Sequence, residues 1–520
     1  MICMYFSPYM AWLFIFFSFP WCLLKCNTLN IALINVLNFY KYYVKLYLNI
    51  GDAFMTENTK NFSGSKLLTG IVLSILTYWL FAQSFLNIGP KIQSTFSTSP
   101  DIVNISISLT SFVTGVFMVV AGNFSDKLGK VKMTRIALIL SIIGSLMLIV
   151  SGNVVLLLMG RVVQGLSAAI IMPATISIVN DFFEGDERQK ALSYWSIGAF
   201  GGTGLSSFFA GAMATFISWQ SIFVLSIILS LLALFLLNKL PESKLVKSTS
   251  NQFDYIGLTI FVIMIESISF VITQGYKMGW LSTPTLVLSL LFFVCIFVFY
   301  KFEKSKRAPF IDLELFKNRP YIGAVLANFL LNTGVGVIAL FNMYVQGGLK
   351  LSAFQAGMLT LPYVITLLLV VRLGEKSIKR FGAKRVMVIG PIFTALGILL
   401  FSFTFFDKPL YIIVSLIGAV CFGGGTGLFA TPALSTAVST TPPEKVGVAS
   451  GIFKMGSTLG GAFGIAIMTS IYTAIIQSGQ SMEAAASIGF IVGTCLVACG
   501  VLASALIIPT RKIKTRLKTS

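Results

Sequence analysis

The 520-residue chain contains no histidine, and only 18 of its residues are acidic. Histidine is the commonest metal ligand and the side chain most often used as a general base near neutral pH. Metal-dependent enzymes and hydrolases with a serine–histidine pair are therefore poor explanations of this sequence. We expect no catalytic residue, no metal site and no cofactor.

The chain also has few cysteines and no long polar segment. Its seven cysteines show no metal-like spacing, and six of them fall in or near apolar segments. A membrane-embedded enzyme or sensor would need a catalytic constellation or a soluble domain, and neither is visible. Because no nucleotide-binding domain fits between the apolar segments, ATP is not expected to drive the protein directly.

Apolar residues dominate what is present. The sequence is 56% hydrophobic and 11% charged, with a mean hydropathy of +0.89. About half the residues of an ordinary soluble domain are polar, and many apolar runs here reach the ~20 residues needed to cross a bilayer. We predict an all-α polytopic membrane protein with fourteen spans, at 67–89, 102–122, 133–151, 154–178, 191–216, 219–238, 256–274, 283–300, 321–345, 356–373, 386–406, 410–431, 448–474 and 486–508.

The positive charge is unevenly distributed between the loops. A net charge of +20 would suggest nucleic acid in a soluble protein, but here the basic residues occupy short loops between spans. With fourteen spans, 29 Lys and Arg fall on one side and four on the other. The positive-inside rule makes the richer side cytoplasmic. We expect a multi-pass protein of the cell membrane, no nucleic-acid partner, and both termini in the cytoplasm.

Residues 1–54 do not fit this scheme. Residues 5–24 form an aromatic, apolar run without an early basic region or a small-residue cleavage site, which argues against a signal peptide. As a fifteenth span they would place the N-terminus outside. Met55 opens the polar stretch MTENTKNFSGSK, which is typical of a cytoplasmic start. Our hypothesis is that translation begins at Met55.

The loop after the second span reads GNFSDKLGKVK, residues 122–132. Gly122 would let two helices approach closely, and Gly129 would permit a turn with positive φ. Asp126 can accept hydrogen bonds from a helix N-terminus or pair with an arginine. With Lys127 and Lys130 it would form a charge latch at a helix hairpin. Simple anchoring by loop charge explains the spacing equally well.

This spacing, G-x-x-x-D-[RK]-x-G-[RK]-x-[RK], resembles the signature between the second and third helices of the major facilitator superfamily. A degraded copy without the aspartate follows span 10, over residues 372–385. Arg161-Val-Val-Gln164-Gly165 resembles the R-x-x-Q-G motif of proton-coupled exporters, and Gly198, Gly201, Gly202 and Gly204 are similar to an antiporter-helix motif. Further stretches, such as LTYWLFAQS (76–84), resemble Nor-type quinolone-resistance exporters, which are fourteen-helix drug:H⁺ antiporters.

The resemblance implies a division of the chain. Residues 55–238 and 309–509 would form two six-helix bundles, 239–308 a linker with two extra helices, and 510–520 a basic tail. It also implies a monomeric exporter of small amphipathic drugs, such as quinolones, quaternary ammonium compounds and dyes, driven by protons through alternating access. The alternative on the same fold is a proton-coupled carrier of an endogenous metabolite or osmolyte.

Candidates for proton coupling are few because acids are scarce. Arg161 and Gln164 lie within span 4, where a buried guanidinium must find a partner; structural bonds to backbone carbonyls are the alternative role. Glu266 lies near mid-membrane in span 7, where burial could let it carry a proton. Packing as a neutral acid is the alternative. Asp181 and Asp126 are the remaining acidic candidates.

Several polar and aromatic residues could line a drug cavity, since such pockets are mostly apolar with a few polar anchors. Lys454, two turns into span 13, could repel cations, bind an acidic drug group or extend to the interface. The glycines of 423–427 and of span 13 are predicted to serve helix packing. The cavity candidates are Trp79, Gln83, Tyr194, Trp195, Asn328, Asn332 and Tyr363.

Overall fold

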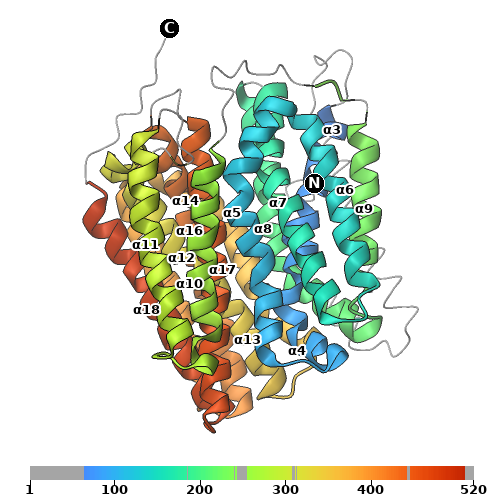
Figure 1. Ribbon diagram of the computed structural model, residues 1–520, viewed down its shortest axis with the longest axis vertical. Helices are drawn as coiled ribbons and strands as arrows, with labels where there is room; N and C mark the ends of the chain where they lie inside the picture. The colour runs from blue at the N-terminus through green and yellow to red at the C-terminus, as the bar shows by residue number, and fades with distance from the viewer. Residues whose placement is uncertain are drawn as a thin grey trace, which may run out of the picture.

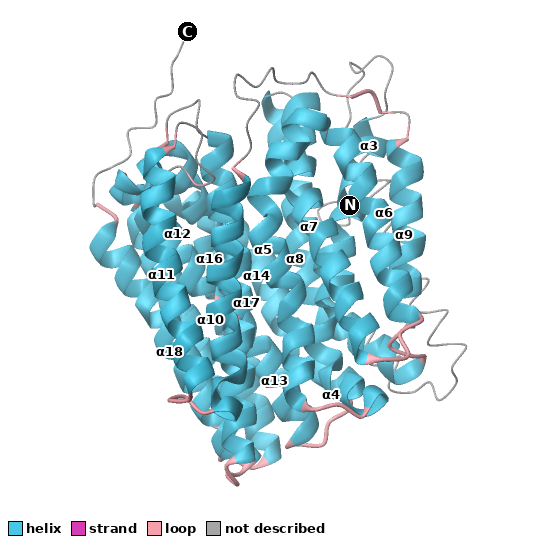
Figure 2. Cartoon of the chain, viewed as in Figure 1, coloured by secondary structure: helices cyan, strands magenta, loops and turns pink. Residues whose placement is uncertain are grey.

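The computed structural model describes residues 64–183, 185–238, 240–242, 254–306, 311, 313–441 and 446–509. Across these ranges the chain forms helices joined by short connections, and no strand occurs among them (Figures 1 and 2). The predicted all-α membrane fold is confirmed. The hypothesis of a start at Met55 and the predicted basic tail 510–520 fall outside the described residues.

The first half of the described chain forms six passes through the long axis of the molecule. The first pass is irregular: helix α3 is followed by a π-helical turn, η1, a 3-10 turn, η2, and helix α4. The elements are α3 (Gly64–Leu76), η1 (Thr77–Phe81), η2 (Ala82–Ser84), α4 (Phe85–Phe96), α5 (Pro100–Leu128), α6 (Lys130–Ile149), α7 (Val154–Phe182), α8 (Gly185–Phe216) and α9 (Ser221–Leu237).

The second half begins with a helix hairpin and continues through six further passes. The pass predicted as one span at 321–345 is broken at Thr333 and Gly334 into two helices. The elements are α10 (Tyr255–Met278), α11 (Thr283–Ser305), η3 (Leu313–Lys317), α12 (Arg319–Asn332), α13 (Val335–Gly347), α14 (Ala353–Phe381), α15 (Ala383–Phe401), α16 (Lys408–Ser439), α17 (Val446–Gln477) and α18 (Met482–Ile507).

The count of fourteen spans is supported for twelve. Among the described residues, 12 helical segments are long and apolar enough to cross a membrane. The other two predicted spans are helices α8 and α9. Helix α9 is apolar but has only 17 residues, and α8 is glycine-rich and begins in the polar stretch GDERQK.

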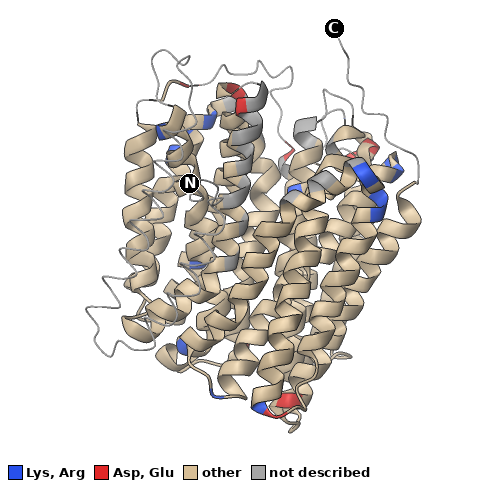
Figure 3. Cartoon of the chain, turned by 180° about the vertical axis from the view of Figure 1, so that it is seen from behind, with Lys and Arg blue, Asp and Glu red and all other residues tan. Residues whose placement is uncertain are grey.

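The helices end at two chemically different faces. Lysine and arginine gather mainly at the end where the described chain terminates, which we call the basic end (Figure 3). Lys91 in α4, Lys350 after α13 and Lys408 at the start of α16 lie at the opposite end. Large apolar side chains such as Leu290, Phe293 and Phe297 of α11 are exposed between the two ends, as expected for a surface that contacts lipid.

Two hydrophobic cores follow the two halves of the chain. One core gathers buried residues of α3 to α9, and the other gathers those of α12 to α18. Phe112, Val116 and Val120 of α5 belong to the second core, as do Phe261 and Ile265 of α10. Helix α5 of the first half and the hairpin helix α10 therefore both pack against helices of the α12–α18 group. The boundary at α5 is a seam between the halves.

Glycines allow the closest helix contacts, as predicted. A Cβ at Gly460 or Gly464 of α17 would overlap the backbone carbonyl of Phe329 or Thr333, and one at Gly423 of α16 would overlap that of Tyr363. Because backbone atoms cannot move aside as a flexible side chain can, these glycines are required by packing.

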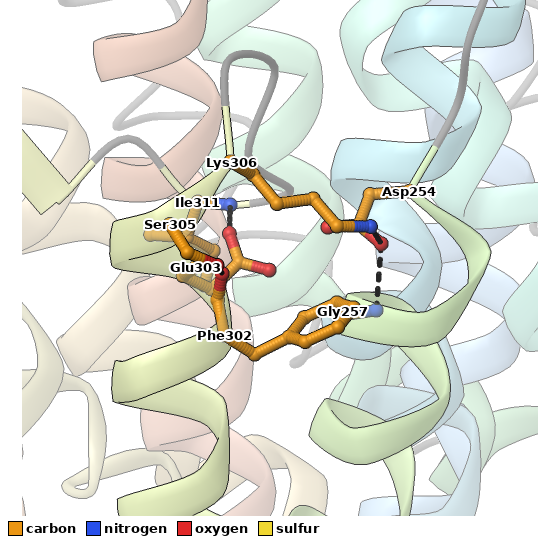
Figure 4. A network of polar contacts seen from close by, with 7 residues as sticks. All are labelled: Asp254, Gly257, Phe302, Glu303, Ser305, Lys306 and Ile311. Atoms are coloured by element: carbon orange, nitrogen blue, oxygen red, sulfur yellow. Dashed lines mark hydrogen bonds and ion pairs between the residues drawn. The ribbon is translucent and has the colours of Figure 1, made fainter.

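The α10–α11 hairpin is fastened at the basic end by a buried polar cluster (Figure 4). The Lys306 ammonium lies 2.7 Å from an Asp254 carboxylate oxygen, and the Gly257 N–H donates to the same oxygen. The Ile311 N–H donates to Glu303 at 3.0 Å, which ties the hairpin to the following segment. Burial alone would raise the pKa of Asp254. The hydrogen bond and positive charge of Lys306, together with the hydrogen bond from the Gly257 N–H, hold this pKa below its usual value.

Candidate functional site

The polar stretch 122–132 is mostly helical. Helix α5 continues to Leu128, so only Gly129 separates it from α6; the stretch is not the loop that the sequence suggested. Beyond the apolar span, water can solvate the polar side chains without ending the helix. Gly129 has φ of +106°, as predicted for a tight turn. Lys130 forms an ion pair of 2.7 Å with Asp181 at the end of α7.

Two residues missed by the sequence reasoning complete this corner. The carboxylate of Glu242 accepts hydrogen bonds from the N–H groups of Val131 and Lys132, each at 2.9 Å, and so caps the N-terminus of α6. Arg135 donates to three backbone carbonyls at and after the end of α9. A carboxylate some 110 residues from the helix that it caps leaves no local signal in the sequence.

The rest of the proposed latch is only partly described. A Cβ at Gly122 would lie 3.6 Å from Pro173 of α7, an ordinary van der Waals contact. The side chains of Asp126 and Lys127 are outside the described residues. The described part of the corner, Gly129 with the Lys130–Asp181 pair, joins helices within the first half of the chain.

Arg161 of α7 is 1% exposed and is held by the first two passes. Its guanidinium donates to the carbonyls of Ser106 and Ala82 at 2.8 and 2.9 Å and to that of Ile107 at 3.4 Å. It also donates to Gln164 Oε1 at 2.9 Å. The guanidinium lies 4.1 Å from the centroid of the Phe85 ring. These contacts include the backbone bonds anticipated as a structural role for Arg161.

The irregular turn in the first pass positions one of these acceptors. Ala82 begins the 3-10 turn that follows the π-helical segment. Such a change of helix type disturbs the regular i→i+4 ladder, and the Ala82 carbonyl accepts from Arg161. Thr110 of α5 reciprocates by donating to the Arg161 carbonyl at 3.0 Å. Helices α5 and α7 and the first pass are therefore locked together around one buried cation.

Beside this cluster lie two of the predicted cavity residues. Gln83 donates to Ser111 Oγ at 3.4 Å, and Tyr78 shares that hydroxyl at 3.3 Å. The indole N–H of Trp79 is buried and has no hydrogen-bond partner among the described residues.

The α8 glycines that resemble an antiporter motif lie next to the first pass. A Cβ at Gly202 would lie 2.9 Å from Trp79 Cβ, and one at Gly198 would lie 3.3 Å from Val72. Gly201 is buried in the same helix and Gly204 follows it. These contacts bring α8 close to the irregular turn.

Trp195 and Lys454 meet across the seam between the halves. The Trp195 indole of α8 donates to Thr175 Oγ1 of α7 at 3.0 Å, which fixes its ring. The Lys454 ammonium of α17 lies 5.5 Å from the ring centroid. Tyr194, adjacent in sequence, is partly exposed. A cation–π contact contributes about 0.5–2 kcal/mol, whereas removing an ammonium from water costs several kcal/mol.

The remaining cavity candidates pack within the second half. Asn328 of α12 donates to the Phe453 carbonyl at 3.0 Å and to Ser457 Oγ at 2.6 Å. Asn332 donates to the Asn328 carbonyl at 2.7 Å. Tyr363 is buried, and its ring lies 5.0 Å from that of Phe422. These contacts join α12 to α17 and α14 to α16.

Glu266 lies apart from the other candidates. Its side chain is exposed on α10, a helix whose apolar window is only 33% buried by the rest of the protein. Ser267 and Ile265, its neighbours in sequence, face inward and are buried. The side chain of Glu266 therefore lies on the surface of the helix bundle and not between its helices.

At the opposite end, neutral amides join the two halves. Asn87 of α4 donates to Asn342 Oδ1 at 3.0 Å and to the Ala353 carbonyl at 3.3 Å. Gln346 donates to the Asn87 carbonyl at 2.7 Å, and Asn342 to Ser207 at 3.4 Å. We call Asn87, Asn342 and Gln346 the amide cluster.

A further hydrogen bond between the halves lies near this end. Asn104 donates to Thr473 at 3.1 Å. The Oδ1 atoms of Asn87 and Asn104 are buried and accept no hydrogen bond from the part of the chain that the structure describes. Side-chain hydrogen bonds thus join the two halves at this end, although two amide oxygens there have no partner among the described residues.

Comparison with known proteins follows this architecture. Residues 67–465 and 322–519 match the family model described as Major Facilitator Superfamily. Quinolone resistance protein NorB of Staphylococcus aureus strain MRSA252 is 44% identical over 430 residues, covering 82% of this chain and 93% of that protein. NorB of strain MSSA476 is 45% identical over 411 residues, covering 79% and 89%.

Solved structures share the fold at low sequence identity. A D-xylose-proton symporter superposes with a TM-score of 0.60 at 15% identity, covering 85% of this chain and 98% of that chain. The peptide transporter POT in complex with sulfate superposes with a TM-score of 0.62 at 14% identity, covering 85% and 96%. At these identities the likeness shows the fold alone.

Proposed function

Because this chain belongs to the major facilitator superfamily, we propose that it exports amphipathic drugs, including quinolones, from the cell in exchange for protons. The observation that carries the proposal is its 44% identity, over 82% of the chain, to quinolone resistance protein NorB. The length and apolar character of its helices agree with a multi-pass membrane protein. The basic end is proposed to face the cytoplasm, since basic residues favour that side.

Alternating access would use the seam between the halves. Neutral hydrogen bonds contribute roughly 1 kcal/mol each, so the bonds between the halves can break at modest cost. Asn87 donates to Asn342 and Ala353, and these bonds would close the outer side while the inner side is open. The corner at Gly129, with its Lys130–Asp181 pair, would move with the first half as one body.

We assign Arg161 a positioning role within this transport cycle. Its guanidinium is bonded to backbone carbonyls and to Gln164, and it holds the first pass against α5 and α7. Protons would instead be exchanged by an acid near the basic end. Asp126 is the candidate to test first, because Asp181 is paired with Lys130 and Glu266 lies on the surface of the helix bundle and not between its helices.

The test is efflux of norfloxacin and ethidium from cells, with and without a proton uncoupler, comparing the wild type with Asp126→Asn. We expect uncoupler-sensitive efflux that the substitution abolishes. Efflux that survives collapse of the proton gradient would remove the coupling. Absence of efflux of both compounds by correctly inserted protein would favour a metabolite or osmolyte carrier.

A further inference from the structure

A charged side chain lies between the two halves without an acidic partner among the described residues. Lys454 is the eighth residue after Val446, where α17 begins, so it lies about 12 Å along the helix from the basic end. Trp195 is the tenth residue after Gly185, where α8 begins, at a similar depth of about 15 Å. The two residues come from different halves and meet within the membrane-spanning part.

The direction of Lys454 decides between its possible roles. A lysine that extends to the interface would direct its ammonium along its own helix toward the basic end. Here the ammonium lies 5.5 Å from the Trp195 ring centroid, across the seam. The indole is fixed by its bond to Thr175, so the ring presents a defined face to the cation.

There is open space on the same helix. A Cβ added to Gly451, one turn before Lys454, would meet no atom of the described residues within 4 Å. Lys454 itself remains partly exposed, although it lies between two halves that are tightly packed nearby, where a Cβ at Gly115 would lie 2.6 Å from Leu459. A ligand that entered this space would lie one helical turn from Lys454, whose ammonium is 5.5 Å from the centroid of the buried Trp195 ring.

We propose that Lys454 and Trp195 form a recognition site for the carboxylate of an amphipathic aromatic compound, an inference that rests on the proposed drug export. The ammonium pairs with the carboxylate, and the apolar ring of the compound lies against the indole. An anion supplied by the substrate provides the charge partner that Lys454 lacks among the described residues. A permanently cationic compound gains nothing from this residue.

The experiment compares binding and efflux of three compounds: norfloxacin, its methyl ester and ethidium. Binding is measured on the purified full chain in lipid nanodiscs, and efflux in cells, for the wild type, Lys454→Gln and Lys454→Arg. We expect Lys454→Gln to weaken norfloxacin binding by about tenfold or more, as for loss of a charged hydrogen bond. Binding of the ester and ethidium should change less than twofold, and Lys454→Arg should retain most norfloxacin affinity.

The matched control is Lys301→Gln. Lys301 of α11 also lies over an aromatic ring, that of Phe297 at 4.5 Å, but it is exposed. It should leave the binding of all three compounds unchanged. Because ethidium binding also reports a folded site, a Lys454→Gln protein that binds ethidium but not norfloxacin cannot be explained by misfolding.

The possible failures are distinguishable. Norfloxacin binding that depends on Lys454, without efflux by the wild type, would support the site and refute export. Efflux of norfloxacin with equal affinity in the wild type and Lys454→Gln would refute the site and leave export standing. An equal loss of all three compounds, or no norfloxacin binding by the wild type, would also overturn the carboxylate assignment.

Discussion

Arg161 could act through the geometry of its hydrogen bonds or through its positive charge alone. The guanidinium donates from Nε to Ser106 and from Nη1 to both Ala82 and Gln164, and this planar fork has no equivalent in lysine. An interaction that depended on positive charge alone would survive the change to lysine. A framework of directed bonds would not. The two roles therefore predict different outcomes for one substitution.

We predict that Arg161→Lys lowers the free energy of unfolding by about 2–3 kcal/mol, because at least one bond to the buried charge is lost, and that efflux falls with it. Thermal unfolding in detergent and dye efflux are the measurements. Arg135→Lys is the control. Arg135 also donates to backbone carbonyls but is only partly buried, so this substitution should lower the free energy of unfolding by less. Wild-type stability and efflux in Arg161→Lys would contradict the positioning role.

At the scale of the element, α17 shows how composition sets helix spacing. Gly460 and Gly464 of this helix bring it against the backbone of α12 and of the Thr333–Gly334 break. With no hydrophobic driving force between helices in lipid, such close packing provides much of their association. Gly451 on the same helix faces open space, so the glycines of α17 are not equivalent.

We predict different effects of alanine on stability at two positions of α17. Gly460→Ala should destabilise the protein by about 1–3 kcal/mol, because its Cβ would overlap the Phe329 carbonyl. Gly451→Ala should be neutral or stabilise by about 0.5–1 kcal/mol, since alanine favours helix and nothing obstructs it. Unfolding temperatures of both variants test this, and similar shifts in the two would refute the packing explanation.

At the scale of the whole molecule, the two halves are joined at the opposite end by neutral amides. Asn87 donates to Asn342, and Gln346 donates to the Asn87 carbonyl. At roughly 1 kcal/mol each, such bonds fit an equilibrium of a few kcal/mol between two conformations. The buried Oδ1 of Asn87 has no partner within the described ranges, which lowers the cost of separating the halves further.

Linking the halves through this cluster should stop transport. In a cysteine-free background, Asn87→Cys with Asn342→Cys, joined by a short thiol-reactive linker that a reductant cleaves, is expected to abolish dye efflux reversibly. The control joins Ser145→Cys to Ser226→Cys, whose hydroxyls are 3.4 Å apart within the first half, and should leave efflux intact. Undiminished efflux after complete linking of Asn87→Cys to Asn342→Cys would exclude opening at this end.

The helices of this protein and the turn at Gly129 could be predicted from the local chemistry of the sequence. Long apolar runs form helices because lipid offers no partner for backbone polar groups. Twelve of the fourteen predicted spans are helical segments long and apolar enough to cross a membrane. Gly129 was predictable because only glycine readily adopts a positive φ. The packing glycines of α16 and α17 followed from residue size alone.

Only the tertiary structure decided which faces of these helices meet. Asn87 and Asn342 are 255 residues apart, and Lys454 lies beside Trp195 of the other half. Glu242 caps a helix that begins 112 residues before it. In membrane helices, apolar residues surround the axis on every side, so hydrophobic periodicity does not reveal which face packs inward. The site arises from helix rotation and long-range packing, which no local pattern encodes.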